Sequence, residues 1–130
     1  IMINSAWLNN SQKGSKLDFH FHSNSYISAN YFVDFSAAKH SQLSFVNDRC
    51  FKGRGNAYPT FEIPKSEKKT IYTADSISLN AKEGQIAIWR SHLNHGYSIP
   101  NNSGNRLTLS LNAMPTKLDN GKYSINILKT

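Results

Sequence analysis

The stretch GQIAIWRSHLNHGYSIPNNSGNRLTLSLN, residues 84–112, decides the fold class of this protein. It reads as two β-strands, GQIAIWR and RLTLSLN, separated by a polar segment rich in Asn, Ser, Gly and His. Apolar and polar residues alternate strictly in the second strand, which is typical of a strand with one apolar and one polar face. The polar face consists of Arg106, Thr108, Ser110 and Asn112, and we expect it to line a pocket.

Strand patterns also cover most of the chain on either side of this stretch. They occupy residues 3–9, 17–22, 26–35, 42–47 and 122–129, with shorter candidates at 58–63, 70–73 and 76–80. No segment has a convincing helical period. Many short strands separated by turn signals predict an all-β sandwich or barrel. A jelly roll fits best, because its polar strand faces would line an open mouth. We expect Trp7 and Leu8 to point into the core.

Length and composition indicate a single domain spanning residues 1–130. A chain of this size can build one core without disulfides, and Cys50, the sole cysteine, excludes an internal disulfide and a thiolate metal cage. No apolar run approaches the roughly 20 residues that a membrane helix needs, so a cytoplasmic setting is the default expectation. The sequence begins at Ile1 without an initiator Met, and we expect truncation at the N-terminus.

The net charge of +7 comes from 15 Lys and Arg against 8 Asp and Glu. The basic residues are dispersed, and their densest cluster, Lys65, Lys68 and Lys69, falls in a predicted loop. No basic stripe interleaves with aromatic residues, so nucleic acid is not an expected partner. A basic surface would instead attract anionic substrates.

Histidines at strand spacing are the candidates for chemistry. In LDFHFH, residues 17–22, alternation places Asp18, His20 and His22 on one strand face. His95 follows the first strand of the 84–112 stretch, and Arg106 opens the second. Such a set can hold a metal ion and a carboxylate, because imidazole is a common metal ligand and Arg binds carboxylates with two parallel hydrogen bonds.

Three blocks of this sequence resemble the 2-oxoglutarate- and Fe(II)-dependent oxygenases. They are HFHSNSYISANYFV (20–33), GQIAIWRSHLNH (84–95) and RLTLSLN (106–112), with Trp7-Leu8-Asn9 as the usual entry. They are similar to a branch that carries an H-x-H…S-x-x-Y block, an S-x-L-x-H block and an R-[IL]-[ST]-[IL]-S-[FL]-N block. The resemblance covers most of the chain, and the order and spacing of the blocks match better than any single motif.

The resemblance implies a double-stranded β-helix, the cupin-like jelly roll, with one iron in its mouth. It implies decarboxylation of 2-oxoglutarate by O₂ and hydroxylation of a small molecule, peptide or protein side chain. By this resemblance His20, His22 and His95 would bind Fe(II), and Arg106, eleven positions after His95, would bind the far carboxylate of 2-oxoglutarate. The further cosubstrate contacts to expect are Tyr31, Ser110 and Asn112.

The sequence departs from the broader superfamily at the metal site. The superfamily places Asp or Glu two residues after the first His, where this chain has His22. Three neutral imidazoles bind Fe(II) but bring no negative charge to it, and they bind other divalent ions, such as Zn²⁺, readily. Asp18 and Asp48 are alternative sources of a carboxylate, and His92 is the alternative distal ligand.

Other polar residues have simpler interpretations. His40 lies in a predicted loop and is expected to be solvated, and Cys50 is expected to be inert. The alternative function is a cupin-like jelly-roll binding module without redox activity. Such a module does not need an Arg at the offset of Arg106, whereas a 2-oxoglutarate enzyme needs a carboxylate anchor.

Overall fold

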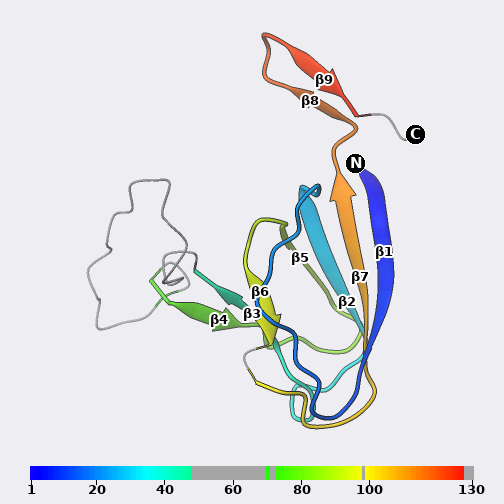
Figure 1. Cartoon of the computed structure of the whole chain (residues 1–130), viewed down its shortest axis with the longest axis vertical. Helices are drawn as coiled ribbons and strands as arrows, with labels where there is room; N and C mark the ends of the chain where they lie inside the picture. The colour runs from blue at the N-terminus through cyan, green and yellow to red at the C-terminus, as the bar shows by residue number, and fades with distance from the viewer. Residues whose placement is uncertain (48–69, 71–72, 98, 128–130) are drawn as a thin grey trace.

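The computed structural model describes residues 1–47, 70, 73–97 and 99–127. Every regular element in these ranges is a β-strand (Figure 1), so none of the described residues forms a helix that could cross a membrane. The all-β class expected from the sequence is confirmed. The predicted strand at 58–63 lies outside the described residues. Thr70 and Thr73 take part in a turn, in which Ala74 N–H donates to Thr70 O, rather than in the predicted strand.

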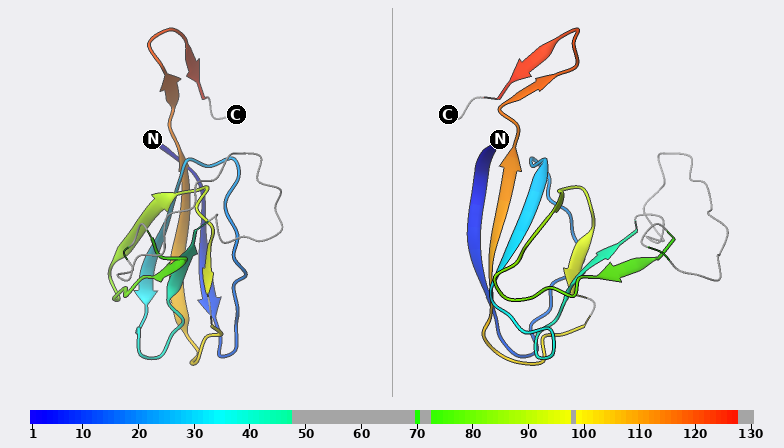
Figure 2. Two further views of the ribbon diagram at one scale, coloured as in Figure 1. Left: turned by 90° about the vertical axis from the view of Figure 1, so that its left-hand side faces the viewer. Right: turned by 180° about the vertical axis from the view of Figure 1, so that it is seen from behind.

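The larger sheet has four antiparallel strands in the order β1-β7-β2-β5. These strands are β1 (Met2–Ser11), β7 (Arg106–Met114), β2 (Ile27–Asp34) and β5 (Ile86–Arg90). The edge strand β1 runs beside β7 along its whole length, so the sheet joins segments about 100 residues apart in the sequence. Figures 1 and 2 show this sheet as one wall of the molecule.

A smaller sheet of three strands has the order β4-β3-β6. Its strands are β4 (Ser76–Ser78), β3 (Leu43–Val46) and β6 (His95–Tyr97). It lies across from β2 and β5 of the larger sheet, and the two layers diverge towards one end (Figure 2). Two antiparallel sheets in this arrangement give the jelly-roll architecture that the sequence predicted.

The segment 17–22 extends the smaller sheet beyond β6, although it forms only an isolated bridge rather than a full strand. His20 N–H donates to His95 O at 3.0 Å, and His95 N–H donates back to His20 O at 2.9 Å. This close approach requires glycine at position 96, because an added Cβ there would lie 2.6 Å from the Leu17 carbonyl oxygen. The predicted strand is therefore an extended segment held against β6 by backbone hydrogen bonds.

The two faces of the larger sheet differ as the alternation of β7 predicted. The polar face of β7 points inward: Arg106 and Thr108 are both fully buried. The apolar face points outward, and pairing places Leu109 of β7 beside Leu8 of β1 and Tyr31 of β2. The expectation that Leu8 enters the core is wrong, since its side chain is 61% exposed. Trp7, its neighbour on the opposite face, lines an internal cavity instead.

The apolar core lies between the sheets and reaches the histidines through Leu43, which also lines their cavity. Its buried members are Phe32, Phe35, Leu43 and Ala81, and the Phe32 and Phe35 rings are 4.8 Å apart. Phe32 is completely buried, because it points inward from the centre of β2. This core fixes β2 against β3 and thereby holds the sheets at the spacing that the polar site needs.

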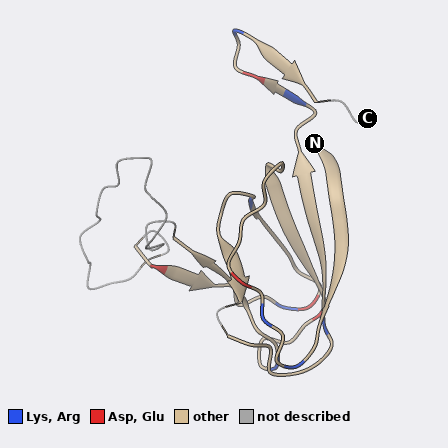
Figure 3. Cartoon of the chain, in the orientation of Figure 1, with Lys and Arg blue, Asp and Glu red and all other residues tan. Residues whose placement is uncertain are grey.

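The chain continues from β7 into a hairpin of β8 (Lys117–Asp119) and β9 (Ser124–Asn126). The hairpin extends away from both sheets (Figure 1), so the terminal strand predicted at 122–129 is shorter than expected and does not join the jelly roll. Lys and Arg are scattered over separate loops and strand ends in the described chain (Figure 3).

Candidate metal centre

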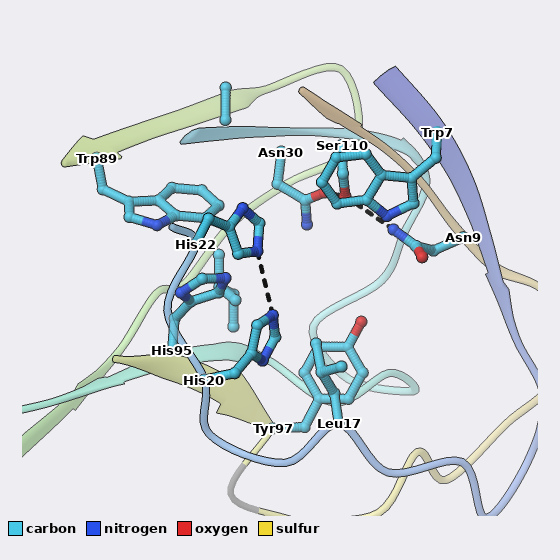
Figure 4. Close-up of a pocket in the computed structure, with 12 residues that line it drawn as sticks. Trp7, Asn9, Leu17, His20, His22, Asn30, Trp89, His95, Tyr97 and Ser110 are labelled. Carbon is cyan, nitrogen blue, oxygen red and sulfur yellow. Dashed lines mark hydrogen bonds between the residues drawn. The ribbon is translucent and has the colours of Figure 1, made fainter. Parts of the chain in front are cut away.

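Three histidines from two distant parts of the sequence meet between the sheets. His20 and His22 come from the extended segment before β2, and His95 opens β6. One ring nitrogen from each lies within 4.8 Å of the other two, and no carboxylate joins this group among the described residues. Figure 4 shows the three rings facing one another. The structure thus brings together the three residues that the sequence predicted as metal ligands.

Each imidazole has a hydrogen-bond acceptor on its Nδ1 side. His20 Nδ1 lies 2.8 Å from Asp18 O, and His95 Nδ1 lies 2.9 Å from Leu93 O. His22 Nδ1 lies 2.6 Å from Asn112 Oδ1. A neutral imidazole carries one N–H, and an acceptor at Nδ1 keeps that proton there. All three Nε2 lone pairs are therefore left free, which is how metal-binding histidines are usually oriented.

The free nitrogens crowd one another in a way that favours a cation. His22 Nε2 lies 3.2 Å from His20 Nε2, and the His20 and His95 ring centroids are 4.4 Å apart. His95 is only 3% exposed, and burial lowers its pKa to about 4. The nearby His20 and His22 lower that pKa further, while the hydrogen bond to Leu93 opposes the shift. His95 therefore stays neutral and able to bind a metal near pH 7.

A cavity of about 60 Å³ adjoins the histidines. Its walls are Trp7, Asn9, Leu17, Ala29, Asn30, Leu43, Trp89, Tyr97 and Ser110, together with the three histidines. Trp89 packs edge-on against His95, with ring centroids 4.8 Å apart. In Figure 4 Trp89 lies on the side of His22 and His95, whereas Trp7 lies beside Asn9, Asn30 and Ser110. The cavity thus adjoins the corner in which the three histidines meet.

Arg106 is fully buried beside this cavity, and Tyr97 separates it from the space. Its Nε donates to Ser41 O at 3.0 Å, its Nη1 donates to Tyr97 Oη, and its guanidinium stacks on the Tyr97 ring at 4.2 Å. Burial lowers the Arg106 pKa, and Tyr97 opposes this shift. Nη2 of Arg106 and the hydroxyl of Thr108 are buried without a hydrogen-bond partner among the described residues. Unpaired buried donors are costly, so they mark a place where a bound anion would be stabilised.

The remaining predicted cosubstrate residues divide into three cases. Ser110 lines the cavity, where its hydroxyl donates to Asn30 and accepts from Asn9. Asn112 contacts His22 rather than the cavity, so it supports a metal ligand. Tyr31 is not brought to the site: it pairs with Leu109 and Ile86 on the outer face and is 37% exposed. The alternation of β2 explains this, because the neighbouring residue Asn30 is the one that points inward.

The alternative ligands fare differently. Asp18 and His92 are exposed and lie outside the three-histidine group, and Asp48 and Cys50 fall outside the described residues. The expectation that His40 is solvated is wrong. Its side chain is 7% exposed, with Nδ1 accepting from Ser36 N–H and Nε2 donating to Gly104 O.

Sequence reasoning missed Tyr97, which lines the cavity and binds Arg106. A signal was available, because Tyr97 follows His95 at strand spacing and must share its face. Gly96 lies between the two residues. The reason that a glycine is needed there, its close contact with Leu17, is visible only in the tertiary structure.

Comparison with known families agrees with this geometry. Residues 5–112 match the model of a family described as "putative 2OG-Fe(II) oxygenase", where 2OG is 2-oxoglutarate. The match includes the three histidines and Arg106. No curated protein matches the chain. Since the match covers most of the sequence, this chain belongs to that 2OG-Fe(II) oxygenase family.

Proposed function

We propose that this protein is an Fe(II)- and 2-oxoglutarate-dependent oxygenase that oxidises a still unspecified substrate. His20, His22 and His95 would hold the metal, and Arg106 would hold the far carboxylate of 2-oxoglutarate. The observation that carries this proposal is the set of three converging histidines whose Nδ1 atoms all face acceptors. Such an arrangement fits a divalent cation, because protons on Nδ1 leave the Nε2 lone pairs of three neighbouring rings available to a metal.

The residues around Arg106 support an anion in the same cavity. Within the described part of the chain, no carboxylate forms an ion pair with the buried guanidinium and its Nη2 has no hydrogen-bond partner. Tyr97 already accepts from Nη1, and its own hydroxyl proton remains available to a ligand on the cavity side. A carboxylate there would gain charge-assisted hydrogen bonds, which are roughly twice as strong as neutral ones. Arg106 and Tyr97 together would thus form the carboxylate anchor.

Each part of the site has a role in the proposed reaction. Bound Fe(II) with 2-oxoglutarate and O₂ would supply the oxidising chemistry, since a facial set of three ligands leaves open positions for cosubstrate and O₂. The histidines fix where that chemistry occurs, and Arg106 with Tyr97 orients the cosubstrate. Trp7 and Trp89 enclose the histidines and limit access of bulk water. Ser110 and Asn30 offer polar contacts on the opposite wall.

The test is an anaerobic titration of the metal-free protein with Fe(II) and then with 2-oxoglutarate, followed by its metal-to-ligand charge-transfer absorption. The wild type should develop the band. His95→Ala should bind neither component, and Arg106→Ala should bind Fe(II) but require far more 2-oxoglutarate. His92→Ala is the matched control, because His92 is exposed and only three positions from His95. Absence of the band in wild-type protein that binds Fe(II) would refute the cosubstrate assignment.

One observation favours a second function, a metal-binding cupin-like module without redox activity. The group of three histidines includes no carboxylate among the described residues, and Arg106 lies behind Tyr97 instead of lining the cavity. A binding module needs the histidines alone. It would bind Fe(II) or Zn²⁺ in the same titration, show no charge-transfer band, and be unaffected by Arg106→Ala.

A further inference from the structure

We propose that Asn112 positions His22 for metal binding, by accepting a hydrogen bond from Nδ1–H and so keeping Nε2 free to face the metal. The inference rests on the proposed metal site and deepens it. It assigns Asn112 to the support of a ligand, in place of the cosubstrate contact expected from the sequence.

The geometry at His22 fixes which ring nitrogen carries the proton. Asn112 Oδ1 lies 2.6 Å from His22 Nδ1, and an amide oxygen can only accept. A neutral imidazole has one proton to give, so that proton sits on Nδ1. Nε2 then presents its lone pair towards His20 Nε2, 3.2 Å away, in the region shared by all three rings. Asn112 therefore makes His22 a competent ligand without touching the metal position.

Buried serines hold Asn112 in this place. Ser28 is 1% exposed, and its hydroxyl donates to Asn112 Oδ1 at 2.9 Å. Ser28 Oγ lies 2.8 Å from Ser91 Oγ, from which it can accept, and Ser91 Oγ lies 2.9 Å from Ser25 Oγ. This chain of hydroxyl groups joins β7, β2 and the residue that follows β5. The acceptor for His22 is thus anchored to the larger sheet, whereas His22 itself belongs to an irregular segment.

His22 differs from the other two ligands in the kind of support it receives. His20 and His95 face backbone carbonyl oxygens, those of Asp18 and Leu93, which no substitution at those positions removes. His22 alone depends on a side chain, and it occupies the position where the broader superfamily has a carboxylate. A substitution at position 112 can therefore change the hydrogen bond that supports the His22 imidazole. An Asp there would be a stronger acceptor and would raise the basicity of His22.

The opposite orientation of the Asn112 amide gives a clear alternative. Nδ2 would then donate to His22 Nδ1, the proton would move to Nε2, and His22 could not bind a metal. Long-range ¹H–¹⁵N NMR correlation of the metal-free protein distinguishes the two tautomers directly, because protonated and unprotonated ring nitrogens have well-separated chemical shifts. Nε2–H on His22 in the wild type would overturn the proposal.

The second readout is the affinity for Co²⁺, an air-stable probe that is followed by its visible absorption. Asn112→Leu preserves size and removes the acceptor at 2.6 Å. The Ser28 hydroxyl, which lies 3.2 Å from His22 Nδ1 and donates to Asn112 in the wild type, is then free to donate to that nitrogen. The variant should therefore lose the Nδ1–H tautomer and weaken Co²⁺ binding by about 10- to 100-fold. Asn112→Asp should keep the tautomer and bind at least as tightly as wild type. Asn10→Leu is the matched control, since it makes the same replacement at an exposed residue of β1 that lies outside the cavity wall. Its Co²⁺ affinity should not change.

These outcomes separate the positioning role from the metal site itself. If Asn112→Leu keeps both the tautomer and the wild-type Co²⁺ affinity, the positioning role is refuted and the metal site stands. If the wild type binds no Co²⁺, the proposed function is refuted. In that case an Nδ1–H tautomer that is present in wild type and lost in Asn112→Leu still supports the contact. Circular dichroism of each variant checks that the fold is retained.

Discussion

Removing the hydroxyl of Tyr97 should destabilise the protein through Arg106, although it deletes only one atom. Arg106 is fully buried and donates to two groups, Ser41 O and Tyr97 Oη. Among the described residues its Nη2 already has no hydrogen-bond partner, so Tyr97→Phe leaves Ser41 O as the one acceptor of this buried cation there. A buried donor left unpaired costs about 1–3 kcal/mol, and more when it is charged. We therefore expect Tyr97→Phe to lower the unfolding free energy by about 2–3 kcal/mol.

A double-mutant cycle isolates this contact. Arg106→Met removes the charge, so adding Tyr97→Phe to it should cost much less than Tyr97→Phe in the wild type. The coupling energy should be about 1.5–3 kcal/mol, the range of hydrogen bonds to charged groups. Urea denaturation of the metal-free protein measures all four variants. Tyr123→Phe is the control: Tyr123 is 68% exposed and should change stability by less than about 0.5 kcal/mol. A coupling energy near zero would refute the Tyr97–Arg106 contact.

Three further perturbations test the fold and the site. Gly96→Ala should destabilise the protein by about 1–3 kcal/mol and weaken Co²⁺ binding, because its Cβ would lie 2.6 Å from Leu17 O and displace the segment carrying His20. An unchanged melting temperature and Co²⁺ affinity would contradict the close contact between Gly96 and Leu17. Phe32→Ala should lower the unfolding free energy, measured by urea denaturation, by about 3–5 kcal/mol, because Phe32 is fully buried. Leu8→Ala should lower it far less, because Leu8 is 61% exposed. Equal losses would mean that the inward and outward faces are misassigned. The unfolding free energy of the metal-free protein should fall as the pH drops from about 6.5 towards 4. His95 has a folded pKa of about 4, so it stays neutral in the folded protein while the same residue takes up a proton in the unfolded chain. The loss from this group is at most about 3 kcal/mol and should shrink in His95→Gln, and an identical pH profile in both proteins would exclude His95 as its source.

The sequence predicted the parts of the site that depend on strand alternation. Period-2 alternation identifies the inner residues of β7 and pairs His20 with His22, because side chains two apart on an extended chain share a face. The order of the blocks then indicated His95 as the distant third member. The same rule, applied to β2, would have excluded Tyr31, since Asn30 and Phe32 are the inward residues there. It would also have found Tyr97 two positions after His95.

Only the tertiary structure decided how the polar residues are paired. The contact between Asn112 and His22 joins residues 90 positions apart, and no local pattern assigns a hydrogen-bond partner at that distance. His40 looked like a loop residue, yet it is buried because Ser36 and Gly104 satisfy both of its nitrogens. Leu8 looked like a core residue, yet it lies on the outer face because the inward direction of β1 is set by Trp7 at the cavity. Alternation determines which residues share a face, whereas sheet packing determines which face is inside and which partners meet there.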